Sequence, residues 1–425
     1  MRGFRSPIAA VAAALVLLGS LSFGSLSLAP AVLAVERDIV VWVPKGFKPA
    51  AVAALPESIE GHRIRVRVRD MSNLPERLLS GSARSAPDLV FIDATGTGPL
   101  AAAALLSPIE FRPSTRKALT RAAIDGFRYG FSVFGVPMQT QNVALVTNAD
   151  LVPEAPRTFA QLRRTALRLK RAGEVTMPLA LGQDPTGAAS QALYPLFSGL
   201  GGFIFGTNAG GSVDPTKVGI DNAAFQKNSG LIDTWNSLGL IDSSISQDRA
   251  REAFLAGQAP FWIAEPSEIP ALTQVDFRYR ISALPSIVEG QTPVPLMRSH
   301  GFAVTTFARQ HGVLSEVNSL VQEVLPGAKA QRAFYDPSPL VGLPANSNAA
   351  ANVPNRQLVA FGAAGSDAIA HPNIQQWGPA SVAFVGAWRA STRGPDADPP
   401  AVPAAESFAA ARSAVRQGQS AAEGG

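Results

Sequence analysis

Residues 39–43, Ile-Val-Val-Trp-Val, form a continuous apolar run, as a strand buried on both faces requires. The next run, Ile64–Arg69, alternates apolar and basic residues with period two, so Ile64, Val66 and Val68 are predicted to face the core. Its arginines are interpreted as a solvated face or edge, with anion binding as the alternative. Further strands are predicted at residues 88–93, 142–147, 259–264, 278–284 and 301–306.

Helical patterns separate these strands, and several carry end signals. Thr158 and Gln161 form a capping box before a helix that Gly173 ends. Gly257 ends a second helix, and Ser315 is a candidate N-cap for a third. A last helix is expected over residues 405–416. Strands alternating with helices predict an α/β fold with parallel sheets covered by helices on both faces.

Apolar stripes at helical spacing support two of these helices. The stripe of the first consists of Phe159, Leu162, Ala166 and Leu169; that of the third consists of Val317, Leu320, Val321 and Val324.

The composition excludes several classes of protein. The chain has 425 residues, of which 46% are apolar and 16% are charged, with a formal charge of +5, so it is neither disordered nor basic enough for a nucleic-acid protein. It contains no Cys, which excludes disulfides, thiolate metal sites and a Cys-linked lipid anchor. Its four His residues show no ligand spacing, so we expect no metal site.

The N-terminus resembles an export signal. Arg2 and Arg5 precede an uncharged stretch with an apolar core at residues 8–18, and Val32-Leu33-Ala34 fits a cleavage site. We therefore predict a signal peptide over residues 1–34, with an uncleaved membrane anchor as the alternative. The mature chain is expected outside the cytoplasm.

No motif of a known catalytic type is present. The sequence has no Walker loop, dinucleotide-binding glycine fingerprint, His-Glu-x-x-His or Gly-x-Ser-x-Gly. Sequence alone does not exclude a pair of acidic residues for glycoside cleavage, and Asp93, Asp184 and Glu265 are the candidates. We expect no cofactor and no catalytic residue.

Five segments, taken in order, resemble the substrate-binding proteins of ABC importers, of the maltose/maltodextrin-binding type. They cover nearly all of residues 36–412 and consist of Ala86-Pro-Asp-Leu-Val-Phe-Ile-Asp93, Gly135–Leu151, Val218-Gly-Ile-Asp-Asn-Ala223, Ala253-Phe-Leu-Ala-Gly-Gln258 with Ile263-Ala-Glu-Pro266, and His371-Pro-Asn-Ile374. The resemblance implies a type II periplasmic-binding-protein-like fold, in which two α/β lobes enclose a ligand cleft.

The resemblance also implies that both lobes are discontinuous in sequence. The N-terminal lobe would comprise residues 36–141 and 285–343, and the C-terminal lobe residues 142–284 and 344–412, followed by a flexible tail at 413–425. The chain would cross between lobes near residues 139–144 and 283–286 and return near 341–344.

The same resemblance suggests the ligand-binding residues. The loop after the strand ending at Asp93 offers that carboxylate with Thr95 and Gly96, and a carboxylate or hydroxyl there can bind a sugar hydroxyl. The full set of expected ligand-binding residues is Lys45, Asp93, Thr95, Gly96, Gln141, Asp184, Glu265, Ser267, Trp377 and Ser381. Helix capping by Asp93, hinge hydrogen bonding by Gln141 and a turn at Asp184 are the structural alternatives.

The aromatic pattern departs from the maltodextrin binders, which stack sugar rings on large aromatic side chains. The matching positions here are Ile92, Ser267 and Ser381, none of them aromatic, which puts linear maltodextrin in doubt. Trp377 lies close to the last of these and is the best replacement platform, with Trp42, Tyr194, Phe197 and Phe203 as the alternatives.

These observations predict a monomeric, non-catalytic receptor for a saccharide or related polyol that partners an ABC permease in the membrane and binds no nucleic acid. The alternatives are a receptor for an anion, peptide or metal, a secreted glycan hydrolase, and an adhesion or scaffold protein. The iron-receptor alternative is disfavoured because its clustered tyrosines are missing: Tyr129, Tyr194, Tyr279 and Tyr335 stand apart.

Overall fold

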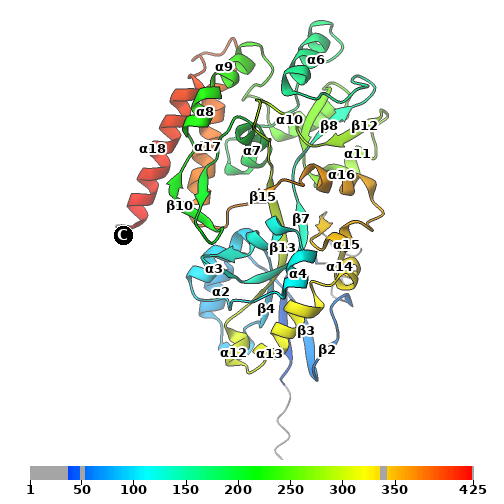
Figure 1. Cartoon of the computed structure of the whole chain (residues 1–425), viewed down its shortest axis with the longest axis vertical. Helices are drawn as coiled ribbons and strands as arrows, with labels where there is room; N and C mark the ends of the chain where they lie inside the picture. The colour runs from blue at the N-terminus through cyan, green and yellow to red at the C-terminus, as the bar shows by residue number, and fades with distance from the viewer. Residues whose placement is uncertain (1–36, 48–52, 336–341, 424–425) are drawn as a thin grey trace, which may run out of the picture. The chain divides into compact units, whose positions relative to one another are not determined.

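The computed structural model describes residues 37–47, 53–335 and 342–423 (Figure 1). The predicted signal segment, residues 1–34, lies outside them. The described chain is a mixed α/β structure with one large and three small sheets.

The large sheet has eight strands, in the order β14-β7-β13-β4-β1-β3-β2 with β15 paired to β13. The bounds of these strands are β1 Ile39–Pro44, β2 Ser58–Ile59, β3 His62–Arg69, β4 Leu89–Asp93, β7 Gly135–Gln141, β13 Leu296–Val304, β14 Leu343–Pro344 and β15 Ile369–Ala370.

The second sheet has the order β11-β8-β12, with β8 Ala144–Asn148, β11 Phe261–Ala264 and β12 Tyr279–Ser282. The other two sheets are pairs: β5 Arg128–Tyr129 with β6 Ser132–Val133, and β9 Phe205–Thr207 with β10 Val213–Val218.

The prediction of parallel sheets is only partly correct. Strand β1 pairs in parallel with β3 and β4, but β13 pairs antiparallel with β4 and β7, and β8 pairs antiparallel with both its neighbours. A long connection that contains helices can return to either end of a sheet, so the alternation of elements does not determine strand direction. Val68 was predicted to face the core but is 48% exposed, because β3 lies next to the edge strand β2 and its C-terminal half is uncovered.

The helices fall into groups around three clusters of buried apolar side chains. The first core lies on the large sheet and includes Phe91, Met138 and Phe302. The helices that contribute to it are α2 Leu74–Ser80, α3 Thr97–Ala102, α5 Arg121–Gly126, α12 Phe307–Gln310, α13 Leu314–Ser319 and α14 Ala328–Tyr335. Helix α4, Pro113–Ala118, has no buried residue and lies between the core residues Phe111 and Leu119 in the chain.

The second and third cores lie on opposite faces of the small sheet. Leu145, Phe261 and Ile263 belong to the second core, and Val146 and Trp262 belong to the third, because successive strand residues point to opposite faces. The second core takes in α6 Phe159–Arg171, α7 Ser190–Gly199, α8 Ala223–Asn228, α9 Gly230–Ser237, α17 Trp377–Ser391 and α18 Ala404–Glu423. The third takes in α10 Gln247–Leu255, α11 Ile269–Leu272 and α16 Arg356–Ala364. The remaining short helix, α15, spans Ser347–Ala350 and contributes to none of the three cores. The prediction of helices on both faces is therefore confirmed for this sheet.

The predicted helix signals of α6 and α10 are confirmed. The Thr158 hydroxyl accepts from the backbone N–H of Gln161, and the four stripe residues of α6 are buried. Gly173 and Gly257, which follow the two helices, both have φ of +72°, as a glycine terminator requires.

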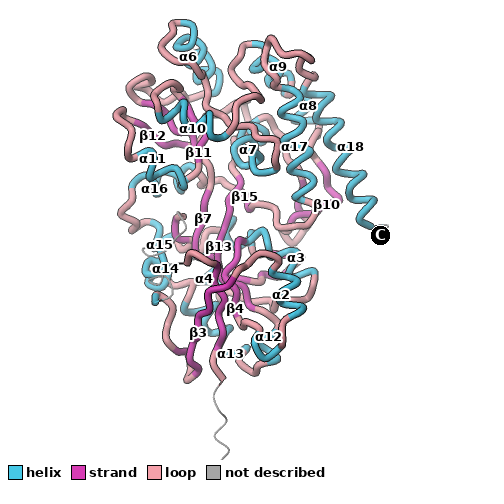
Figure 2. Tube along the Cα trace, turned by 180° about the vertical axis from the view of Figure 1, so that it is seen from behind, coloured by secondary structure: helices cyan, strands magenta, loops and turns pink. Residues whose placement is uncertain are grey.

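Two predicted helices differ from the structure. Ser315 is not a cap, because the helix already begins at Leu314 and continues as a π-helix over Leu320–Val324, which leaves Val324 38% exposed. The helix expected over residues 405–416 extends to Glu423, and it lies alongside α17 in Figures 1 and 2.

Strands β7 and β13 run side by side between the cores (Figure 2). The chain passes from Met138, on β7 in the first core, to Val143, which follows the end of β7 and belongs to the second core. On β13 the change falls between Leu296 in the second core and Met297 in the first. This second passage lies further along the chain than the expected residues 283–286.

Candidate functional site

A cavity of about 900 Å³ opens between segments that are far apart in sequence. One side is formed by Thr95, after β4, and Arg298, on β13. The remainder comes from Val143, the continuous segment 184–192, Gln247, Ile263, Glu265, Glu268, His371, Trp377 and Ser381.

Asp93 is the centre of a hydrogen-bonded cluster on the large-sheet side. Its Oδ2 accepts from Arg298 Nη2 at 2.7 Å and Nε at 3.2 Å and lies 3.3 Å from His300 Nε2. Its Oδ1 accepts from the Thr95 backbone N–H and hydroxyl, both at 2.9 Å, so Asp93 also caps the short 3-10 helix η2, Ala94–Gly96. The helix-capping interpretation and the ligand-loop interpretation of Asp93 are therefore compatible.

The electrostatics of this cluster fix its charge states. Burial alone would raise the pKa of Asp93, but the hydrogen bond and charge of His300, the charge of Arg298 and the Thr95 N–H together hold it well below its usual range. Burial lowers the pKa of Arg298, but Asp93 and, to a smaller extent, Glu265 raise it above its ordinary value. Asp93 and Arg298 are thus an ion pair at neutral pH.

Glu265 and Glu268 lie on the opposite side, at the 3-10 helix η4, Pro266–Glu268, that follows β11. Burial, reinforced by the charge of Glu268, raises the pKa of Glu265 against the opposing charge of Arg298. Glu268 accepts from Arg251 Nε at 2.7 Å. Burial lowers the pKa of His371, so this wall residue is neutral at pH 7.

The segment 184–192 supplies mainly small and polar groups. Asp184 Oδ2 accepts from the backbone N–H of Gln247, the first residue of α10, at 2.8 Å, so this carboxylate already serves a helix end. Gln191 is buried, and its Oε1 has no hydrogen-bond partner within the described part of the chain. A ligand donor in the cavity would satisfy that oxygen.

Trp377 and Ser381 project from the first turns of α17. The Trp377 ring packs edge-on against the His371 ring at 4.9 Å and is 9% exposed. The Ser381 hydroxyl donates to the Gly378 carbonyl oxygen at 2.8 Å. Trp377 therefore offers a partial aromatic surface rather than an open stacking platform.

Five of the ten residues expected from the sequence lie on the cavity wall: Thr95, Asp184, Glu265, Trp377 and Ser381. Asp93 stands behind the wall and acts on it through Arg298. The other four lie off the wall: Gly96 is beside Thr95, Gln141 pairs in register with Arg298, Ser267 is exposed on η4, and Lys45 is exposed and lies 3.7 Å from Asp70.

Sequence reasoning missed Arg298, His371, Gln191 and Gln247. Arg298 precedes Ser-His in the run Leu-Met-Arg-Ser-His-Gly-Phe-Ala-Val of β13. No local signal pointed to Arg298, because Arg298, Ser299 and His300 are all polar and the predicted strand began only at Gly301.

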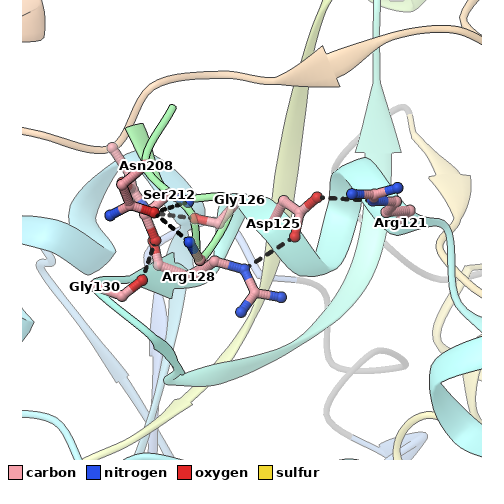
Figure 3. Close-up of polar contacts among 9 residues, drawn as sticks. Arg121, Asp125, Gly126, Arg128, Gly130, Asn208 and Ser212 are labelled. Atoms are coloured by element: carbon pink, nitrogen blue, oxygen red, sulfur yellow. Dashed lines mark hydrogen bonds and ion pairs between the residues drawn. The ribbon is translucent and has the colours of Figure 1, made fainter. Parts of the chain in front are cut away.

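A second contact region lies around the β9–β10 hairpin (Figure 3). Asn208 Oδ1 accepts from the N–H groups of Gly210 and Ser212, and the Ser212 hydroxyl donates to the Gly130 carbonyl oxygen. Close by, Asp125 accepts from Arg128 Nε at 3.1 Å and lies 3.6 Å from Arg121 Nε. The Ser212–Gly130 hydrogen bond joins the hairpin, which packs on the second core, to the β5–β6 turn beside the first core.

Neither a metal site nor a membrane span is found among the described residues. No group of three or more His, Asp or Glu side chains there could hold a metal ion. No helix in the same ranges has the length and apolarity to cross a bilayer.

Comparison with known proteins identifies the family. Residues 47–310 match the family described as bacterial extracellular solute-binding protein, and the chain belongs to that family. Its two-lobed type II periplasmic-binding fold agrees with the α/β architecture and the two strands that pass between cores.

Individual relatives are more distant. The chain is 24% identical over 293 residues to a galactooligosaccharide-binding protein of Bacillus subtilis (strain 168), covering 66% of this chain and 67% of the relative. It is 24% identical to the maltodextrin-binding protein MdxE of the same strain, over 55% of each chain. It is 22% identical to a maltooligosaccharide ABC transporter solute-binding lipoprotein of Streptococcus pneumoniae (strain ATCC BAA-255 / R6), over 74% of this chain and 73% of the relative.

Proposed function

We propose that this chain is the extracytoplasmic receptor of an ABC importer and that it captures a saccharide and delivers it to a membrane permease. The observation that carries the proposal is the cavity of about 900 Å³, whose wall joins Thr95 and Arg298 to Asp184, Glu265 and Trp377. A ligand touching both sides binds the closed form more tightly and shifts the population towards it. The saccharides in the names of the relatives support this ligand class.

The lobe boundaries belong to the same proposal. The sequence predicts a first lobe at residues 36–141 and 285–343 and a second at 142–284 and 344–412. Because Leu284 and Leu296 both belong to the second core, we keep the other bounds and move the boundary at residue 285 to the position after Leu296. Export by residues 1–34 and a monomeric receptor complete the proposal.

Binding without turnover is favoured by the state of the acidic residues. Asp93 is committed to Arg298, and Asp184 accepts the first N–H of α10. A glycosidase needs two carboxyl groups available to the scissile bond, one as acid and one as base or nucleophile. Of the three candidates, Glu265 alone is left for that chemistry.

A thermal-shift screen of the purified protein against neutral mono- and oligosaccharides tests the proposal. A bound sugar at a hundred times its Kd stabilises the folded protein by about 2.7 kcal/mol and raises the melting temperature. Trp377→Leu should weaken the response, whereas Phe131→Leu, at an 80% exposed position off the cavity wall, should not. Release of reducing sugar, or no response to any saccharide, contradicts the proposal.

A further inference from the structure

Glu265 differs from the other acidic residues around the cavity. Asp93 is paired with Arg298, Glu268 with Arg251, and Asp184 with the N–H that begins α10. The Glu265 side chain does not cap η4 and has no hydrogen-bond or ion-pair partner within residues 37–47, 53–335 and 342–423. It is therefore the carboxylate of the wall whose bonding capacity is unused.

The charges on the wall do not balance. Arg298 is its one cation at neutral pH among the described residues, and the charge of Arg298 is already matched by Asp93 behind it. His371 is uncharged because burial lowers its pKa. Glu268 is matched by Arg251, so the carboxylates of Asp184 and Glu265 remain without a neutralising cation.

We propose that Glu265 determines specificity, so that the cavity selects a saccharide that presents hydroxyl or ammonium donors and rejects one that carries a carboxylate. This inference rests on the proposed function. The ligand class is a neutral or amine-bearing sugar, with uronic acids excluded.

The physical reason is the partial burial of Glu265 on the cavity wall, where water screens a charge less than it does in bulk solvent. A carboxylate accepts hydrogen bonds only, so it binds donors strongly and repels a second carboxylate. A uronate bound beside Glu265 would bring like charges together and would remove part of the water that solvates each carboxylate. A protonated amine would instead supply the cation that the wall lacks. Arg298 does not reverse this preference, because Asp93 Oδ2 occupies two of its N–H groups.

Titration calorimetry at pH 7.5 with three sets of 1,4-linked di- and trisaccharides tests the inference. The sets are neutral hexoses, the corresponding hexosamines and the corresponding hexuronic acids. We expect the best hexose or hexosamine to bind at least tenfold more tightly than the matching uronate. Glu265→Gln should reduce that ratio at least threefold. The matched control is Glu252→Gln, which removes the same charge from an exposed position on α10 off the cavity wall and should leave the ratio unchanged.

Each outcome has one meaning. A uronate that binds wild-type protein as tightly as the uncharged sugar overturns the inference. So does an affinity ratio between uncharged sugar and uronate that Glu265→Gln leaves unchanged, or that Glu252→Gln lowers as much as Glu265→Gln does. None of these three results would contradict the proposed saccharide receptor. Failure of all three sets to bind would instead overturn the proposed function, and the inference with it. Thermal melts of both variants separate loss of binding from loss of folding.

Discussion

Replacing Asp93 with Asn tests the ion pair that supports the cavity wall. The amide keeps the size of the side chain and an oxygen for the Thr95 N–H, but it removes the charge that holds Arg298. Loss of one partner of a buried ion pair costs about 3–5 kcal/mol, and an exposed pair contributes less than about 1 kcal/mol. The side chains of Asp93 and Arg298 are 23% and 39% exposed, so solvent screening places the expected loss of unfolding free energy near 2 kcal/mol.

Urea unfolding followed by tryptophan fluorescence measures this loss, and its pH dependence identifies the cause. Because the folded-state pKa of Asp93 is depressed, its stabilisation is complete above the unfolded pKa of about 3.9 and is lost as pH falls through the folded pKa. The difference between wild type and Asp93→Asn should therefore be full at pH 7 and shrink below about pH 4.

The matched control is Asp70→Asn. Asp70 also has a lowered pKa, about 2, through hydrogen bonds from Ser72, but its side chain is 42% exposed and its cationic neighbours Lys45 and Arg77 are exposed too, so it should contribute little to folding. Equal losses in the two variants, or a loss in Asp93→Asn that persists unchanged at pH 3, would refute the reasoning.

Three further predictions concern other sites. Gly98→Ala places a Cβ against the main-chain carbonyl of Asn373, in the segment that leads into α17, so it should lower the unfolding free energy by about 2 kcal/mol. The control Gly96→Ala should not, because its Cβ meets no atom within 4 Å, and equal melting temperatures of the two variants would contradict the prediction. Asp88→Ala removes a fully buried carboxylate that lies 2.6 Å from His311 Nδ1, so it should lower the unfolding free energy measured by chemical denaturation by about 3 kcal/mol. A loss below about 1 kcal/mol would exclude a structural role for this pair. Because burial raises the pKa of Glu265, calorimetric affinity for a neutral hexose oligosaccharide, which does not titrate in this range, should fall as pH drops from 7.5 towards 5, and a flat wild-type profile would argue against contact with that carboxylate.

Local signals in the sequence predicted individual elements well. The Thr158 cap and the α6 stripe depend only on neighbours along the chain, and both are confirmed. The apolar runs of β1, β4, β8 and β11 are likewise visible without tertiary information. Strand direction was not predictable in this way, because it depends on where a long connection re-enters the sheet.

The same difference between local signals and tertiary contacts applies to the residues of the cavity. Thr95 and Asp184 could be proposed because they occupy positions that match segments of a known family. Arg298 could not, since its partner Asp93 is 205 residues away and the interaction exists only once β13 pairs with β4. Its two polar neighbours, Ser299 and His300, interrupt the apolar run and hid the beginning of β13.

The contribution of α18 to the second core determines when that core can form during synthesis. Phe408 is completely buried and packs its ring against Phe225 at 4.5 Å and Phe197 at 5.6 Å, although these partners are made about 180 and 210 residues earlier. Translation at about 5–20 residues per second leaves the earlier aromatic side chains without this partner for roughly ten seconds or longer. A nascent chain of this sequence therefore stays incompletely packed until its last helix has left the ribosome, and any chaperone that holds it must act throughout that interval.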